Sequence, residues 1–142
     1  MRKIVEIAYF EVRVSERYEE ARLVYTGEKP TTIKGAWKIT EMKWFILSVV
    51  TVPGDFILDQ GDSQTCGLCM LFSNGCSGCP ISSDGHPGCV GDTPYRDYLE
   101  TTTLKEAQQA ARAELKYLRR LKKKLKKQSG VEGSTPSRGL TA

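Results

Sequence analysis

Five cysteines lie between positions 66 and 89, and their spacing is the clearest sign of chemistry in the chain. Cys66 and Cys69 form one C-x2-C pair, Cys76 and Cys79 form a second, and Cys89 follows after nine intervening residues. A C-x2-C turn places two thiolates on one side of a tight loop, where a tetrahedral zinc ion binds sulfur at about 2.3 Å. The spacing therefore predicts a metal site.

Zinc is the metal that this donor set favours, because thiolates in tetrahedral groups of four are its usual structural ligands. The Cys-Pro sequence at 79–80 leaves an iron–sulfur cluster as the second possibility. No strand–helix unit is expected around either pair, which argues against a thioredoxin-like redox site. The predicted ligands are Cys66, Cys69, Cys79 and Cys89, with Cys76 and His86 as alternates.

The predicted metal has a structural role. A site saturated with thiolates is a poor Lewis acid, whereas a catalytic zinc keeps an open position. The deaminase signature H-x-E is absent, and no glutamate falls between Cys66 and Cys89. The sequence also contains no P-loop, G-x-S-x-G or H-E-x-x-H motif, so we expect a protein that is not an enzyme.

The N-terminal residues and the longest apolar run predict the cellular compartment. Glu6 and Glu11 interrupt any apolar segment that a secretory signal would need. The apolar run WFILSVVTV is far shorter than the roughly eighteen residues of a membrane span. We therefore expect a cytoplasmic protein with no membrane partner, in a reducing compartment where cysteine pairs bind metal more often than they form disulfides.

The segment 104–127 is the most clearly predicted element. Thr103 and Glu106 form a T-x-x-E capping box, and an apolar residue recurs every seven positions after it. Lysines and arginines crowd the C-terminal end, where the helix dipole favours cations. The repeated apolar positions are Leu104, Ala111, Leu118 and Leu125. The candidate binding residues are Arg119, Arg120, Lys122, Lys123, Lys124, Lys126 and Lys127.

Weaker patterns predict the rest of the fold. A helix is expected over 36–50, with Trp37 and Trp44 on one face as core residues. Alternating β-branched residues favour a strand over 3–14, although a helical face also fits them. A short helix is expected from Ser15 to Gly27.

These patterns divide the chain into four segments. An N-terminal strand and helix segment covers 1–35, and a Trp helix with the metal-binding cysteines covers 36–103. The basic amphipathic helix covers 104–127, and a disordered tail covers 128–142. The fold class is α+β: a small, metal-stabilised, zinc-knuckle-like domain with a long C-terminal amphipathic helix. Such a small domain often needs a staple of this kind.

Charge is distributed unevenly along the chain. Residues 1–103 carry a net charge of −4 and residues 104–127 a net charge of +8. The basic helix favours a sequence-independent contact with nucleic acid, because no aromatic residue interleaves its lysines. The alternative is a protein-interaction module that binds and inhibits a host enzyme or defence complex. It would do so through the acidic residues 1–103, which we call the acidic body, or through the repeated apolar positions of the helix, which we call the apolar seam. The apolar seam could also form a homodimer.

The order of motifs KWFILSVV, TCGLCMLF, CSGCPI, CVGDTPY and EAQQAARAELKYLRRL resembles small uncharacterised cysteine-cluster proteins of tailed phages. The resemblance covers residues 36–121, and the chain departs from the pattern by one residue inserted before Thr93. It implies a phage origin, location in the host-cell cytoplasm and metal binding, but no reaction. In that group all five cysteines recur, which keeps Cys76 a candidate ligand.

Overall fold

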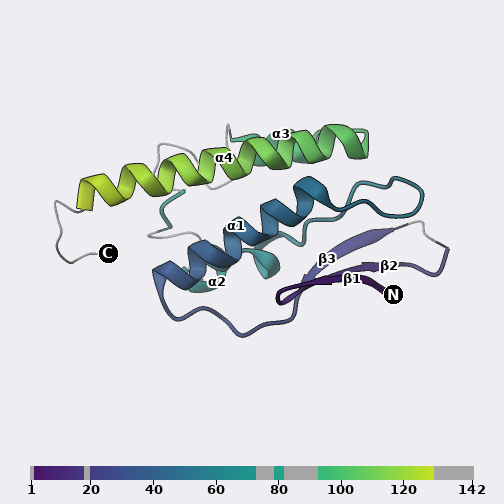
Figure 1. Ribbon diagram of the computed structural model, residues 1–142, viewed down its shortest axis with the longest axis horizontal. Helices are drawn as coiled ribbons and strands as arrows, with labels where there is room; N and C mark the ends of the chain where they lie inside the picture. The colour runs from purple at the N-terminus through teal and green to yellow at the C-terminus, as the bar shows by residue number, and fades with distance from the viewer. Residues whose placement is uncertain (1, 18–19, 73–78, 82–92, 130–142) are drawn as a thin grey trace.

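The molecule combines a small antiparallel sheet with two long helices, and α1 (Ile33–Val49) lies between the sheet and α4 (Leu104–Ser129) (Figure 1). The structure is a computed structural model that describes residues 2–17, 20–72, 79–81 and 93–129. Buried residues from the strands, from α1 and from α4 belong to one hydrophobic core. The mixed α and β content and the long C-terminal helix are as predicted, and the predicted segments share this core.

The sheet is formed by β1 (Arg2–Ile7), β2 (Phe10–Val14) and β3 (Ala21–Tyr25), which pair in sequential antiparallel order. Alternate residues of β2 point into the core, which is the pattern that predicted a strand here. The predicted single strand is instead a hairpin, because the chain reverses at Ala8, whose φ is 53°.

The predicted helix from Ser15 to Gly27 is wrong. Its second half is β3, in which Ala21 and Leu23 are buried and Arg22 between them is exposed. That alternation of period two matches a half-buried strand, and pairing with β2 outweighs the weak helical signal of the glutamates before it.

The helix expected over 36–50 is confirmed as α1. Thr32 caps its first turn, because the backbone N–H of Gly35 donates to the Thr32 hydroxyl at 3.0 Å. The helix ends at Val49, before Val50 adopts an extended conformation. Trp37 and Trp44 are 5% and 1% exposed, so their interpretation as core residues is confirmed.

The C-terminal helix α4 begins as predicted and extends to Ser129. The N–H of Glu106 donates to the Thr103 hydroxyl at 3.1 Å, and the Glu106 carboxylate accepts from the N–H of Thr102 at 3.2 Å. The short helix α3 (Pro94–Leu99) packs against α4.

The apolar seam of α4 faces the inside of the molecule. Leu104, Ala111 and Leu118 are buried, and Leu125 is partly buried against the core. The seam therefore does not offer a surface for a second copy or a partner helix, and a dimer built on it would have to break the core. This corrects the part of the alternative hypothesis that rested on the seam.

Between α1 and α3, the described parts of the chain run as a connecting segment with two short helical elements. The segment pairs with β3 through a parallel bridge between Arg22 and Asp59. It continues through the 3-10 helix η1 (Asp62–Thr65) into α2 (Gly67–Leu71), which packs against α1. The cysteine segment begins there, and the zinc-knuckle part of the predicted fold stays a prediction.

Candidate metal centre and nucleic-acid interface

The first C-x2-C pair is positioned by the packing of α2 on α1. Cys66 precedes the first turn of α2, and Cys69 lies one turn further on. Gly67 makes this packing possible, because a Cβ atom there would lie 2.7 Å from Cβ of Ile39 on α1. Cys66 is buried and Cys69 is half-buried, so the pair lies at the edge of the core.

The surroundings of Cys66 favour a thiolate. Hydrogen bonding from the Cys69 thiol lowers the pKa of Cys66 to about 5, with a smaller contribution from the cation of Lys43, although burial opposes the change. Thr40 Oγ1 lies 3.7 Å from the Cys66 sulfur and also accepts from the N–H of Leu68 at 3.0 Å. A deprotonated sulfur is the form that binds a metal ion.

Lys43 forms a buried polar cluster next to this pair. Its side chain is fully buried, and the ammonium donates to Gln60 Oε1 at 2.8 Å and to the carbonyl oxygen of Asp62 at 3.0 Å. The Tyr95 hydroxyl donates to the same Gln60 oxygen at 2.9 Å, and the ring of Trp44 lies 5.2 Å from the ammonium. The cluster therefore places a fixed positive charge inside the core near the thiols.

Sequence reasoning missed this cluster. The available signal was a lysine among apolar residues of α1, one position before Trp44 and three after Thr40, both of which are buried. Buried lysines are rare unless they are hydrogen-bonded, and the partners of Lys43 come from residues seventeen and nineteen positions away. Spacing along one helix does not predict them.

The structure brings only part of the predicted ligand set together. Among the residues it describes, no three His, Cys, Asp or Glu side chains lie close enough to hold a metal ion. Cys79 is buried but does not form such a group with Cys66 and Cys69. Cys76, His86 and Cys89 lie outside the described residues. Two adjacent sulfurs fit one half of a tetrahedral thiolate site, and the full set stays a prediction.

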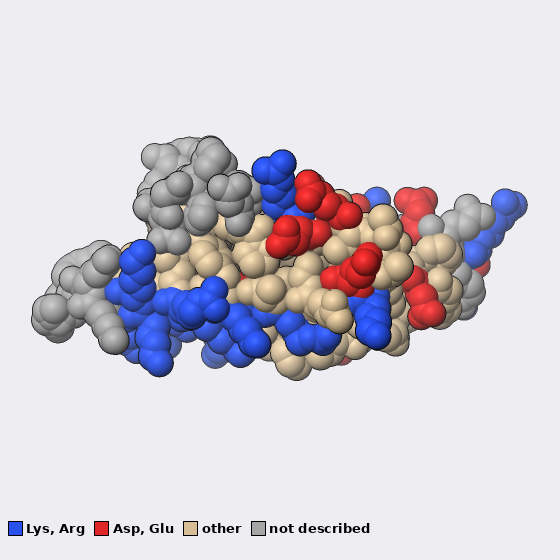
Figure 2. All heavy atoms as spheres, turned by 90° about the horizontal axis from the view of Figure 1, so that it is seen from above, with Lys and Arg blue, Asp and Glu red and all other residues tan. Residues whose placement is uncertain are grey.

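The second candidate site is the outward face of α4. Cations at spacings of three, four and seven residues share one face of an α-helix, and the face opposite to them is buried. Figure 2, which looks down onto α4, shows Lys and Arg as a band along one edge, with the acidic side chains beyond it. We call this band the basic stripe. Its exposed members are Lys105, Arg112, Lys116, Arg119, Arg120, Lys123 and Lys126.

Most of the predicted binding residues belong to this surface. Arg119, Arg120, Lys123 and Lys126 lie in the stripe, and Lys124 is exposed beside it. Lys122 is half-buried and forms an ion pair with Glu41 of α1 at 2.9 Å. The side chain of Lys127 lies outside the described part. Lys105, Arg112 and Lys116 were missed, because they are spread along the helix rather than clustered in the sequence.

Contacts between α1 and α4 fix which residues of α1 border the stripe. Arg112 donates to the carbonyl oxygen of Ser48 at 2.9 Å, and Arg119 pairs with Glu41 at 3.4 Å, so the helices run antiparallel. Lys38 and Lys34 lie three and seven residues before Glu41 and are exposed. They therefore lie level with the last turns of α4 and extend its positive surface.

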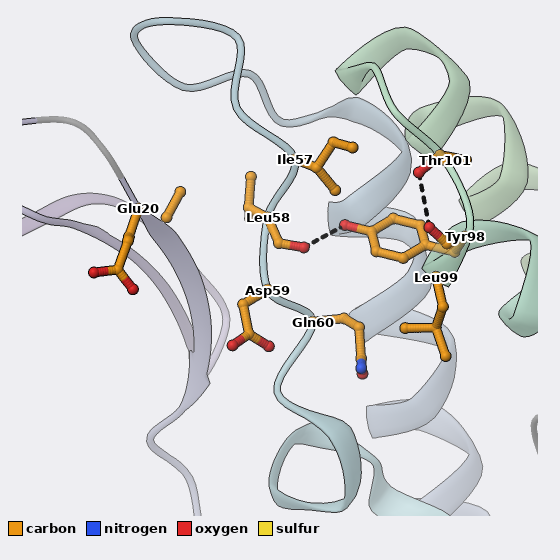
Figure 3. A pocket seen from close by; sticks show the side chains of 9 residues that line it. Glu20, Ile57, Leu58, Asp59, Gln60, Tyr98, Leu99 and Thr101 are labelled. Carbon is orange, nitrogen blue, oxygen red and sulfur yellow. Dashed lines mark hydrogen bonds between the residues drawn. The ribbon is translucent and has the colours of Figure 1, made fainter.

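A cleft of about 320 Å³ lies elsewhere, between β3, residues 57–60 and α3 (Figure 3). Glu20 and Asp59 contribute carboxylates to its lining. The Tyr98 hydroxyl donates to the carbonyl oxygen of Leu58 at 2.7 Å, and burial, followed by the charge of Asp59, raises the pKa of Tyr98. The phenol therefore stays protonated at neutral pH and holds the connecting segment in place. None of the predicted site residues lines this cleft.

No helix among the described residues is long and apolar enough to cross a membrane. Comparison with family models, with curated proteins and with solved structures finds no match for the chain. The resemblance to phage cysteine-cluster proteins therefore stays an expectation from the motifs.

Proposed function

We propose that the chain is a non-enzymatic nucleic-acid-binding module whose basic stripe contacts phosphates. The observation that supports this is the stripe itself, which runs from Lys105 to Lys126 on the exposed face of a helix whose opposite face is anchored in the core. At 1.5 Å per residue it is about 32 Å long. Helix α4 contributes no acidic side chain to this face, because Glu106 lies at its edge and Glu114 is buried.

The packing of α4 against the core affects its affinity for nucleic acid. A cation on a packed helix loses less conformational freedom on binding than one on an unstructured tail, so more of the electrostatic gain is retained. Each phosphate that is neutralised releases a condensed counterion, which makes such binding strongly salt-dependent and independent of base sequence. Both properties fit a surface of separate lysines and arginines that form no bidentate readout of base edges.

The zinc ion belongs to this proposal as a structural element. Cys66 and Cys69 would supply two of its ligands, and the remaining ligands would come from Cys76, Cys79, Cys89 or His86. The buried ammonium of Lys43 would offset part of the negative charge of a site rich in thiolates. The C-x2-C spacing of Cys66 and Cys69 and their neighbouring positions at the start of α2 are what support it.

The alternative, a module that binds a host protein, now has less support. Its apolar seam is buried, and Figure 2 shows Lys and Arg as a band along one edge of the molecule. Acidic side chains remain exposed beside the stripe, and Glu20 and Asp59 line the cleft between β3 and α3.

The proposal is tested with a variant that changes Lys116, Arg120 and Lys123 to Gln. A matched control changes Arg17, Arg22 and Lys29 to Gln, which removes the same charge from exposed positions away from the stripe. Binding of a fluorescent 20-base-pair duplex and of a 20-nucleotide poly-dT strand is measured by anisotropy across a salt series.

We expect the stripe variant to bind more weakly and its salt slope to shrink by about 0.9 per lost duplex contact or about 0.7 per lost single-strand contact. The control variant should bind nearly as the wild type does. Equal losses in the two variants would show that only net charge matters, and would overturn the stripe as the binding surface.

A further inference from the structure

Phe45 is an exposed aromatic side chain on α1 that the core does not use. It is 43% exposed, while the other aromatic residues of the same helix, Trp37 and Trp44, are buried. Val49, one turn further along, is 50% exposed, and Met42 is half-buried on the same outward face. The outward side of α1 therefore presents a short apolar surface that contains one flat ring.

The position of this ring is fixed by the contacts between α1 and α4. Phe45 lies midway between Glu41, which pairs with Arg119, and Ser48, whose carbonyl oxygen accepts from Arg112. Because the helices are antiparallel, Phe45 is level with Lys116, midway between those two arginines. The ring thus borders the basic stripe at the middle of its length, level with the cations of α4 between Arg112 and Arg119.

We propose that Phe45 is a base-stacking site and that the stripe binds single-stranded nucleic acid. This inference rests on the proposed function and makes it more specific. A strand whose phosphates follow α4 carries bases that project sideways, and an aromatic ring beside a row of cations is the arrangement on which such bases stack. In a duplex the bases already stack on one another, so their faces do not reach the ring. The positive charge of the stripe beside Phe45 favours this occupant over an apolar protein segment.

A comparison of two strands of equal charge tests the inference. One is a 20-nucleotide poly-dT strand, and the other is a 20-unit abasic strand with the same phosphodiester backbone. The wild type should bind poly-dT more tightly, by about fivefold to a hundredfold, since base–aromatic stacking contributes on this scale for a single base. Backbone charge alone predicts equal affinities.

Three variants distinguish stacking on the Phe45 ring from contact with the apolar surface around it. Phe45→Leu keeps an apolar side chain without a flat face and should bring the two affinities close together. Phe45→Trp keeps an aromatic face and should preserve the preference for poly-dT. Val49→Ala removes a neighbouring exposed apolar group and should leave the preference unchanged. Both positions are on the surface, and circular dichroism confirms that each variant is folded.

The possible failures are distinguishable. If Phe45→Leu keeps the full preference for poly-dT over the abasic strand, the stacking site is wrong. The same holds if the wild type shows no such preference. In both cases the stripe remains the proposed binding surface. If Phe45→Leu weakens duplex binding as much as strand binding, the ring contacts a duplex and the single-strand assignment is wrong. If neither strand nor duplex binds the wild type, the proposed function fails together with this inference.

Discussion

Gly67 shows at the scale of one residue how closely the cysteine pair is attached to the core. A Cβ atom at this position would overlap the carbonyl oxygen of Ala36 and approach Cβ of Ile39 to 2.7 Å. Both obstacles belong to the packed interior of α1 rather than to a flexible side chain. Only glycine allows α2, and Cys66 with it, to approach α1 this closely.

We therefore expect Gly67→Ala to lower the free energy of unfolding by about 1 to 3 kcal/mol through overpacking. Gly35→Ala is the matched control, because its Cβ would meet only Thr32 Oγ1 at 3.2 Å and Cβ of Pro30 at 3.8 Å. Alanine is also the better helix former, so the control should be unchanged or up to about 1 kcal/mol more stable. Urea unfolding measures both, and equal results would contradict the tight α1–α2 contact.

Single residues differ in how well the sequence predicts them. The cysteines could be selected from their spacing alone, because C-x2-C is a local pattern with a local chemical reason. Lys43 could not be recognised, because its partners Gln60, Asp62 and Tyr95 are brought to it only by the folded chain. Phe45 was not selected for a similar reason: a phenylalanine in an apolar helix is expected to be buried, and its exposure depends on which side of α1 the other elements cover.

At the scale of elements, the two long helices were predictable and the N-terminal sheet only in part. Helices α1 and α4 each repeat an apolar pattern over several turns and begin at a threonine cap. The apolar pattern and the cap both indicate a helix at the same place in the sequence. The region of β3 has only five strand residues and follows polar residues that suit a helix start. Its pairing with β2 is a tertiary effect that a local pattern does not contain.

The cysteine segment is the element whose stability should depend on metal. If zinc joins Cys66 and Cys69 to later cysteines, its removal breaks the bonds that tie this pair to the rest of the segment and weakens the contact between α2 and α1. We expect a chelator to lower the melting temperature by on the order of 10 °C or more. The same chelator saturated with zinc is the control and should have no effect.

Elemental analysis of the purified protein complements this measurement. Stoichiometric zinc without visible absorbance supports the proposal, and iron with a visible band would replace zinc by an iron–sulfur cluster. Purified protein that contains neither metal and melts at the same temperature with and without chelator would contradict a metal centre.

At the scale of the whole molecule, the proposed binding surface depends on two helices that are far apart in the sequence. Arg112 and Arg119 lie about seventy positions from the residues of α1 that they contact. The charge difference between residues 1–103 and 104–127 predicted that α4 would be basic. It did not predict that Lys34, Lys38 and Phe45 would border the same surface, because that requires the antiparallel register of α1 and α4.

Glu41 gives this surface a further property. Its carboxylate lies between Arg119 at 3.4 Å and Lys122 at 2.9 Å, so two cations beside the proposed path of the phosphates already hold an anion. The protein thus carries its own competitor for phosphate, and an incoming strand must displace it. Weak or short ligands would be rejected, whereas a strand that makes many contacts at once would not.

Glu41→Gln should therefore bind poly-dT several-fold more tightly than the wild type and with a steeper salt slope, by up to about 0.7 for each released cation. Glu16→Gln, which removes the same charge from an exposed position away from α4, should change neither quantity. Equal affinities in the two variants would mean that Glu41 only holds the helices together. If the expected difference is found, the ion pair that joins α1 to α4 is also a self-inhibitory contact, and it sets the threshold at which the module engages its ligand.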